Sequence, residues 1–364
     1  MIRHAAFLLS FIVIFTTCQA SDWPTARGDA RSSGVAPGKI SDSPEVRWTY
    51  AGEKDAFEAT PVIADGVVYL GSLYGNFYAL ELKTGKVLWK FYVKLGFSAP
   101  AAVSGGRVFV GDGGGFFHAL DAKTGEELWN KDVIGTMNAA PGFYEDRVLF
   151  TVESGELFCL DVKTGKEIWK YESTDQLHCG VTLLADTILL GSCDRSLQVV
   201  DAKTGELLKR LDVDAQTGAT VAVNEAGCAF LGTMGSEVLG FSPEYEILWR
   251  YMPEDRRGEF RSNAAATKER VFIGGRNRCL TCLDAKTGEE LWTFPTRRGI
   301  DTSPVVIGDR VLFHAMEGKI FLLDAADGKE VWSYETGGSL MASPAVADGA
   351  FITATGQGEV LCFE

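Results

Sequence analysis

The sequence predicts an all-β propeller, a ring of eight blades of four strands each. A tryptophan recurs along the chain, short β-rich runs alternate with Gly/Asp turns, and no stretch after residue 20 has a sustained helical period. A repeat of about 40 residues is typical of propellers and solenoids, whose units bury their faces against neighbours. The recurring positions, at steps of 40 to 43 residues with Lys209 in one slot, are Trp48, Trp89, Trp129, Trp169, Trp249, Trp292 and Trp332.

The N-terminus predicts export. Arg3 precedes an apolar run over 5–15 and small residues up to Ala20, so residues 1–20 are interpreted as a signal peptide cleaved before Ser21. Lipidation of Cys18 is the alternative, although residues 15–17 make a poor lipobox. The run is too short for a membrane span. We expect a periplasmic or outer-membrane-associated protein with a lead-in segment over 21–44 and the propeller over 45–364.

One repeat illustrates the four strands. Within 99–131, β-rich runs at 107–110 and 116–120 are bounded by the turns at 104–106, 112–115 and 121–125, and Trp129 lies on the outermost run. In the turn Asp121-Ala-Lys-Thr-Gly125, the aspartate is expected to accept hydrogen bonds from amides two and three residues later. The glycine tolerates the left-handed conformation that ends the turn. The large, flat tryptophan is interpreted as a packing residue between blades.

The two ends of the chain predict how the ring closes. The repeats begin on an outer strand near Trp48, with no inner strands before it, and end near Glu364, with no outer strand after it. The first strand should therefore complete the last blade and remove the free edge. This gives eight blades, one of them composite, while seven is the alternative number.

Charge limits the range of partners. The precursor carries a formal charge of −14, and the mature chain −15, because the signal peptide contains one arginine and no acid. Such a balance disfavours nucleic acid and a bare anionic membrane as partners.

Seven cysteines remain after residue 20, an odd number for an exported protein. Cys159, Cys282 and Cys362 share a repeat slot that alanine fills elsewhere, so they are interpreted as small buried residues. Cys179 and Cys193 lie on two strands expected to be antiparallel, and a disulfide between them is possible if their Cβ atoms are close and suitably aimed.

No metal or catalytic constellation is evident in the sequence. The mature chain has three histidines, His118, His178 and His314, which fall in different repeats without a pairing motif. Cys279-x-x-Cys282 has no second such pair, which disfavours zinc. The glycines at 113–115 lack the ending and the helix of a phosphate loop.

Arginines are concentrated in one part of the acidic chain, in loops that strand parity places on one rim of the ring. Arginine forks suit carboxylate or phosphate recognition, so this group is a candidate partner-binding site. The alternative is an ordinary solvated rim, partly neutralised by neighbouring acids. The group consists of Arg256, Arg257, Arg261, Arg276, Arg278, Arg297 and Arg298.

The phrase from Leu120 to Trp129, preceded by Val108-Phe-Val-Gly111, resembles the PQQ-type propeller repeat over roughly residues 45–364. The same repeat builds quinoprotein dehydrogenases and BamB-type outer-membrane assembly proteins, and the lead-in at Trp23-Pro24 is similar to that of exported members. The dehydrogenase resemblance implies an adjacent cysteine pair, a tryptophan stacked on the quinone and Glu/Asn/Asp ligands for calcium. This chain has no adjacent cysteine pair and no recognisable ligand set.

The resemblance to BamB-type proteins implies a non-catalytic envelope scaffold that binds a protein partner through its rim loops and needs no cofactor. The alternative function is a PQQ- and calcium-dependent oxidoreductase. A third possibility, a sensor of a small ligand or glycan in the funnel, has no specific residue in its favour.

Overall fold

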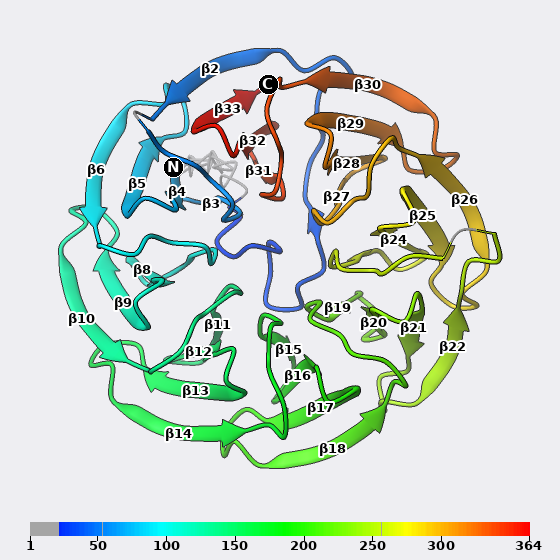
Figure 1. The fold of residues 1–364 in the computed structure, drawn as a ribbon, viewed down its shortest axis with the longest axis horizontal. Helices are drawn as coiled ribbons and strands as arrows, with labels where there is room; N and C mark the ends of the chain where they lie inside the picture. Colours follow the sequence, from blue (N-terminus) through cyan, green and yellow to red (C-terminus); the bar gives the residue numbers. More distant parts are fainter. Residues whose placement is uncertain (1–21, 53, 256) are drawn as a thin grey trace, which may run out of the picture.

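The computed structural model describes residues 22–52, 54–255 and 257–364. Figure 1 shows that the described chain forms a closed ring of sheets around a central axis. Eight sheets are present among these residues, so the prediction of an eight-bladed propeller is confirmed. No helix among them is long and apolar enough to cross a membrane. The predicted signal peptide, Cys18 and Arg256 lie outside the described residues.

Blades 1 to 4 follow one another in the chain, each with its strands in order from the axis outward. Blade 1 contains β3 (Val62–Ala64), β4 (Val67–Gly71), β5 (Asn76–Glu81) and β6 (Val87–Tyr92). Blade 2 contains β7 (Ala102–Ser104), β8 (Arg107–Gly111), β9 (Phe116–Asp121) and β10 (Glu127–Asp132). Blade 3 contains β11 (Gly142–Tyr144), β12 (Arg147–Thr151), β13 (Glu156–Asp161) and β14 (Glu167–Glu172). Blade 4 contains β15 (Thr182–Leu184), β16 (Thr187–Ser192), β17 (Ser196–Asp201) and β18 (Leu207–Asp212).

Blades 5 to 8 complete the ring, and the last two recruit strands from the N-terminal part. Blade 5 contains β19 (Ala222–Val223), β20 (Ala229–Gly232), β21 (Val238–Phe241) and β22 (Ile247–Tyr251). Blade 6 contains β23 (Ala265–Ala266), β24 (Arg270–Gly274), β25 (Cys279–Asp284) and β26 (Glu290–Pro295). Blade 7 contains β27 (Val305–Ile307), β28 (Arg310–Ala315), β29 (Lys319–Asp324) and β30 (Glu330–Glu335), with β1 (Val35–Ala36) added. Blade 8 contains β31 (Ala345–Ala347), β32 (Ala350–Ala354), β33 (Glu359–Phe363) and β2 (Val46–Ala51).

The Asp-x-x-Thr-Gly turns form one rim, here called the turn rim. In blade 2, Asp121 Oδ1 accepts hydrogen bonds from the backbone N–H groups of Lys123 and Thr124, both at 2.9 Å. Gly125 has φ +74°, and a Cβ atom built there would lie 2.5 Å from Cε3 of Trp89 in the previous blade. Trp89 Nε1 donates to the carbonyl of Ala122 at 3.0 Å. Six of the seven tryptophans have the glycine of the next blade beneath the ring in this way, whereas Trp332 packs against Phe351 and Phe363 of blade 8.

The seam between blades 4 and 5 uses a different pair. Lys209 replaces the tryptophan, and its Nζ donates to the carbonyls of Glu244 and Tyr245 at 3.1 and 3.0 Å. Tyr245 takes the place of the glycine at φ +63°. The lysine therefore supplies the hydrogen bond that the tryptophan indole supplies elsewhere, and the tyrosine hydroxyl lies 2.6 Å from Thr187 Oγ1 of blade 4.

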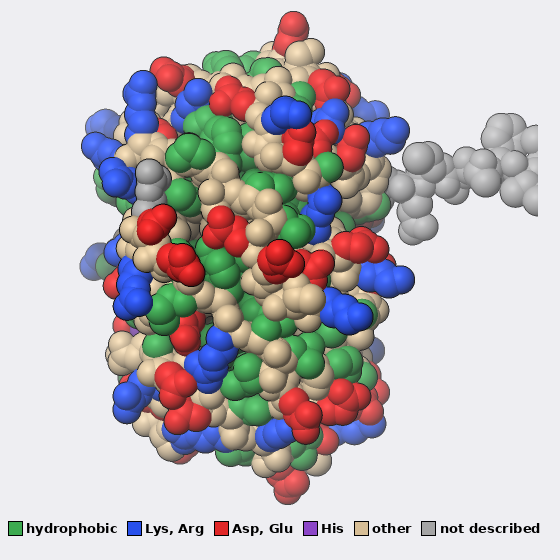
Figure 2. Space-filling view, turned by 90° about the vertical axis from the view of Figure 1, so that its right-hand side faces the viewer, with side chains coloured by type: hydrophobic (Ala, Val, Ile, Leu, Met, Phe, Trp, Pro, Cys, Tyr) green, Lys and Arg blue, Asp and Glu red, His purple; other side chains and the backbone are tan. Residues whose placement is uncertain are grey.

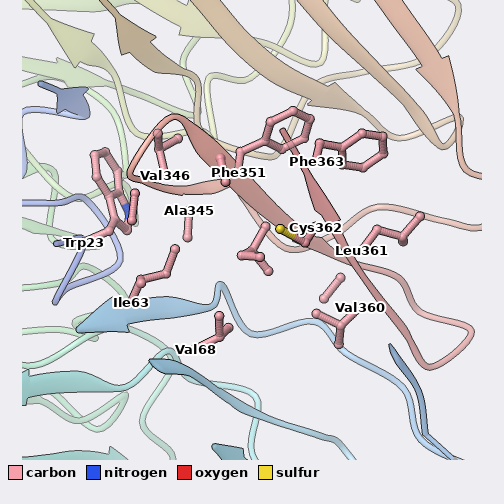
Figure 3. Packing of buried hydrophobic residues seen from close by; sticks show 14 of the residues in the cluster. Trp23, Ile63, Val68, Ala345, Val346, Phe351, Val360, Leu361, Cys362 and Phe363 are labelled. Atoms are coloured by element: carbon pink, nitrogen blue, oxygen red, sulfur yellow. The ribbon is translucent and has the colours of Figure 1, made fainter. Parts of the chain in front are cut away.

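The ring closes as the sequence predicts. Strand β2 pairs antiparallel with β33, with Val46 opposite Phe363, and Arg47 forms an ion pair with Glu364 at 2.6 Å. Figure 3 shows Phe351, Cys362 and Phe363 of blade 8 in one apolar cluster that also includes side chains of blade 1 and Trp23 of the lead-in. Burial of this cluster holds the two ends of the repeat array together.

The lead-in is more than a connection to the first blade. Residues 22–36, here called the strap, run along the inner strands, and Figure 1 shows this dark-blue segment crossing the middle of the ring. Trp23 pairs with Ile63, and β1 pairs parallel with β27. Carbonyls of the strap accept hydrogen bonds from the backbone N–H groups of Val103, Leu183, Val223, Ala266 and Val306. The strap therefore satisfies inner-strand donors that would otherwise face the channel.

Arg27 anchors the middle of the strap. Its side chain is buried, and Nη2 donates to the carbonyls of Ala264 and Pro304, both at 2.9 Å. Burial lowers the pKa of Arg27 to about 10, so the guanidinium remains protonated at neutral pH. The arginine thus joins the strap to the inner ends of blades 6 and 7.

Candidate functional site

The rim opposite the turn rim, here called the loop rim, carries the loops between blades and the turns between second and third strands. A funnel of about 450 Å³ opens within the ring, and the strap forms part of its wall. Equivalent positions of successive blades line it at steps of 40 or 43 residues, including Glu58, Ser98, Asn138, His178, Gly218, Arg261 and Asp301.

The residues two positions further along the loops form a belt of hydrogen bonds around part of the funnel. In this belt the backbone N–H of one blade donates to a side-chain oxygen of the next blade. The links run from Gly180 to Thr220, Thr220 to Asn263, Asn263 to Ser303, Ser303 to Ser343 and Ser343 to Thr60, at 2.6–3.1 Å. Pro100 and Ala140 occupy the two remaining positions and carry no side-chain acceptor. The belt therefore joins six of the blades at the neck of the funnel.

The funnel does not present the groups that the dehydrogenase resemblance implies. Its lining includes neither tryptophan nor cysteine. Asp301 is engaged by Arg276, and Asp29 by Arg31 and Ser33. Across residues 22–52, 54–255 and 257–364, no three His, Cys, Asp or Glu residues are grouped so as to hold a metal ion. These residues do not fit a stacked quinone with calcium, and the expectation that no cofactor binds stays a prediction.

The described arginines of the predicted group all lie on the loop rim. Arg257 and Arg261 lie in the loop entering blade 6, Arg276 and Arg278 in the turn between β24 and β25, and Arg297 and Arg298 in the loop entering blade 7. The carbonyl of Arg278 accepts a hydrogen bond from Thr296 N–H at 2.8 Å, which brings this turn against the next loop. We call these six residues the basic sector.

Two of the six arginines are neutralised by acids. Arg276 binds Asp301 through Nε and Nη2 at 3.1 and 2.8 Å, and its Nη1 lies 3.4 Å from Glu259. Glu259 also accepts from Arg261 at 2.6 Å. The hydrogen bonds to Asp301 raise the pKa of Arg276. This network fixes the geometry of the sector, but it leaves no net charge on these four groups.

The remaining arginines, Arg257, Arg278, Arg297 and Arg298, are exposed and have no carboxylate partner among the described residues. Glu317 accepts the backbone N–H groups of Arg297 and Arg298 at 3.1 Å and so fixes that loop while their side chains stay in solvent. Figure 2 views the ring from the side and shows Lys and Arg side chains interspersed with Asp and Glu. The sector therefore presents free guanidinium groups on a partly compensated surface.

Arg278 occupies an unfavourable backbone position. It has φ +66°, and the equivalent turn position holds Gly75, Gly115, Gly155, Gly318 and Gly358 in five other blades, Arg195 at φ +63° in blade 4 and Ser236 at φ +69° in blade 5. A non-glycine residue in the left-handed region costs about 1–2 kcal/mol relative to ordinary backbone. Its exposed side chain has no hydrogen bond or ion pair within the described chain that would offset this cost.

The histidines lie in three unrelated settings. His118 Nδ1 lies 2.6 Å from Glu127 Oε1, and Nε2 lies 3.2 Å from Asp112 Oδ2. Burial lowers the pKa of His118, but the bonds to these two carboxylates outweigh burial and raise the pKa above its ordinary value. Full burial lowers the pKa of His314 to about 4. His178 lines the funnel.

The cysteines are all unbridged among the described residues, and Cys179 and Cys193 are both buried. Burial raises the pKa of the Cys179 thiol to about 12, which makes it a poor nucleophile in the reduced form. The disulfide between Cys179 and Cys193 stays a prediction. Cys159, Cys282 and Cys362 are completely buried.

The comparisons with known proteins agree with this architecture. The family model described as outer membrane protein assembly factor BamB matches residues 75–234 and 234–364, which is most of the chain. This chain belongs to the BamB family. No curated protein matches the sequence.

Solved structures related to this BamB-family chain by fold include both functional types. BamB from Moraxella catarrhalis is 18% identical with a TM-score of 0.75, over 88% of this chain and 97% of that one. A quinohemoprotein alcohol dehydrogenase from Comamonas testosteroni is 15% identical with a TM-score of 0.82, over 94% and 80%. A europium-containing methanol dehydrogenase is 13% identical with a TM-score of 0.82, over 94% and 98%. Likeness at these identities shows the shared propeller fold and leaves scaffold and oxidoreductase both open.

Proposed function

We propose that this chain is a non-catalytic scaffold of the bacterial cell envelope that binds a protein partner through the basic sector during outer-membrane protein assembly. Membership of the BamB family supports the envelope location and the assembly process. The observation that carries the proposal is Arg278, an exposed arginine in a left-handed position where five other blades have glycine. Strained residues that the fold does not require are concentrated at functional sites.

The partner surface that suits this sector is acidic. Arginine forks bind carboxylates through two parallel hydrogen bonds, and the four free guanidinium groups offer several such forks. Because the chain as a whole is acidic, this local reversal of charge would orient an acidic partner on the loop rim.

Cross-linking in the producing bacterium tests the proposal. A photoreactive residue at Arg278 or Arg298 should give adducts with envelope proteins, whereas the same residue at Lys123 or Lys163 on the turn rim should give none. Deletion of the gene should lower the amount of folded outer-membrane protein. Equal adducts from both rims, or none from the loop rim, would refute a partner-binding role for the basic sector.

The alternative is a PQQ-dependent oxidoreductase, and the observation in its favour is the fold shared with two dehydrogenases. Calorimetric titration of the mature protein with PQQ, with and without calcium, separates the two functions. We expect no saturable heat in either case, because the funnel lining lacks a stacking tryptophan and a ligand cluster. Stoichiometric, calcium-dependent binding would overturn the scaffold proposal.

A further inference from the structure

A second unusual surface lies on the loop rim, in blades 1 and 2 and the loop that leaves blade 2. Five large apolar side chains are exposed there, and we call them the apolar sector. They are Tyr74 (62% exposed), Tyr92 (65%), Leu95 (62%), Phe116 (38%) and Ile134 (87%). Contiguous exposed apolar residues on a soluble protein commonly mark an interaction surface.

Glycines allow the neighbouring loops of this sector to close on one another. A Cβ atom on Gly75 would lie 2.9 Å from Cε2 of Tyr92. One on Gly113 would lie 2.6 Å from the carbonyl oxygen of Leu95, and one on Gly115 would lie 3.2 Å from that of Gly135. The turns of blades 1 and 2 therefore pack directly against the loops that carry the exposed side chains, and the five residues follow one continuous stretch of rim.

The repeat itself provides a control for the apolar residues. At the loop position of Ile134, other blades have Lys54, Lys94, Thr174, Asp214, Arg297 and Gly337. At the turn position of Tyr74, other blades have Gly114, Ser154, Asp194, Gly235, Asn277, Glu317 and Gln357. The same fold thus accepts polar residues or glycine at these places, and the propeller does not require apolar ones.

Ile134 is the least expected of the five. Its φ is +43°, a left-handed conformation that β-branched residues rarely adopt. Lys54, Asp214 and Gly337 share the left-handed conformation at the same loop position. An isoleucine that is 87% exposed gains almost nothing from burial within this chain, so its place in the sector has no explanation in the stability of the blade.

Two groups of hydrogen bonds hold the sector in shape, one partly buried and one exposed. Asp112 Oδ1 accepts hydrogen bonds from the N–H groups of Gly114 and Phe116, both at 2.8 Å, while its other oxygen faces His118. Asp132 Oδ1 accepts the N–H of Ile134 at 3.3 Å. Because these backbone groups are already fixed, a ligand that binds here orders little of the surface, which favours affinity.

We propose that the apolar sector docks an extended segment of a partner protein that carries apolar side chains and carboxylates. The inference deepens the proposed function and rests on it, since it describes the partner of the same rim. Lys90 and Lys94 are exposed beside Tyr92 and Leu95, so the charges next to these two apolar side chains are positive, whereas Asp132 is exposed beside Ile134 and Phe116.

Short synthetic peptides test the chemistry of this partner. A fluorescent peptide of alternating Leu and Glu should bind the mature protein at least about tenfold more tightly than a Leu/Lys or a Ser/Glu peptide, as measured by anisotropy. The triple variant Tyr74→Ser, Leu95→Gly and Ile134→Thr takes its residues from other blades and changes no charge. It should fold normally and lose at least about tenfold in affinity, since a few apolar anchors dominate such interfaces.

A matched control removes similar apolar area from the flank of the ring. Leu128, Leu208 and Leu248 precede the outer-strand packing residue and are 47–55% exposed. The triple variant with threonine at these positions should bind the Leu/Glu peptide like the unmodified protein. Equal loss in both triples, equal binding of all three peptides, or no peptide binding at all would overturn the proposal.

Two further measurements identify another occupant. Self-association that the apolar-sector triple abolishes would assign the surface to a second copy of the chain and overturn the proposal. If the unmodified protein binds vesicles of anionic phospholipid but no peptide, and the apolar-sector triple variant loses the vesicle binding, the surface belongs to a membrane and the proposal is overturned. Failure of the proposed function is distinguishable, because peptide binding would then persist while cross-linking at Arg278 gives no adducts.

Discussion

Replacing Arg278 by glycine tests the partner-binding role of the loop rim separately from the stability of the fold. The substitution restores the residue that five other blades have at this turn position. The two hydrogen bonds of the residue, from its N–H to the carbonyl of Gly275 at 3.1 Å and from Thr296 N–H to its carbonyl at 2.8 Å, belong to the backbone and remain. Only the exposed side chain is lost.

The expected stability change follows from the backbone. Relief of the left-handed conformation at φ +66° contributes about 1–2 kcal/mol, and the larger conformational entropy of glycine in the unfolded chain offsets about 0.4–1 kcal/mol of it. The free energy of unfolding should therefore rise by about 1 kcal/mol, or about 1–2 °C in Tm for a domain of this size. Arg278→Ala removes the same charge but keeps the strain, so it should gain no stability.

Two assays on the same proteins test this reasoning. Calorimetry should show the small rise in Tm for Arg278→Gly, while capture of the cross-linked envelope partner through Arg298 should fall for both Arg278 variants. Ser236→Gly is the matched control, because Ser236 holds the same turn position in blade 5 at φ +69° without a charge. It should gain stability and leave capture unchanged. A lower Tm for Arg278→Gly would refute the strain argument, and unchanged capture would refute the contact role.

Three further predictions concern the fold that carries both sectors. His118→Gln should destabilise the protein more near pH 6 than near pH 9. The two carboxylates raise the folded-state pKa of His118, so its stabilisation is complete below about pH 6.5 and is lost as the pH rises through the folded pKa. An equal difference in Tm at both pH values would contradict this. Arg27→Met should lower the free energy of unfolding by about 2–4 kcal/mol in urea titrations, since two buried carbonyls lose their donor, and a neutral result would show that the strap does not need its anchor. Lys209→Trp should lower the free energy of unfolding by about 1–3 kcal/mol, because the indole would overpack against Tyr245. Adding Tyr245→Gly to this variant should recover at least about 1 kcal/mol. Additive effects of the two substitutions would show that the positions are not coupled.

The architecture could be predicted because the same short sequence signals recur along the chain. The aspartate, glycine and tryptophan of one unit determine a turn and its packing against the next unit, and about 40 residues of spacing repeat that instruction around the ring. Strand parity alone predicted that the arginines lie together on one rim. Their ion pairs did not, because Asp301 and Glu259 lie 25 and 17 positions from Arg276 and meet it only across loops.

Other features needed the folded ring. The belt of Thr, Asn and Ser side chains has the 40-residue spacing and could have been read as a ring of equivalent positions, but its hydrogen bonds require neighbouring blades at the measured distances. The apolar sector consists of residues that look unremarkable one at a time, and only exposure shows that Ile134 and Tyr74 lie outside the core. The strap carries no repeat at all, so its course through the channel depends on inner-strand donors that exist only once the blades surround it. Sequence by itself therefore determined the ring, since period and turn chemistry are local, whereas tertiary structure decided which side chains remain free to meet a partner, since exposure depends on every blade at once.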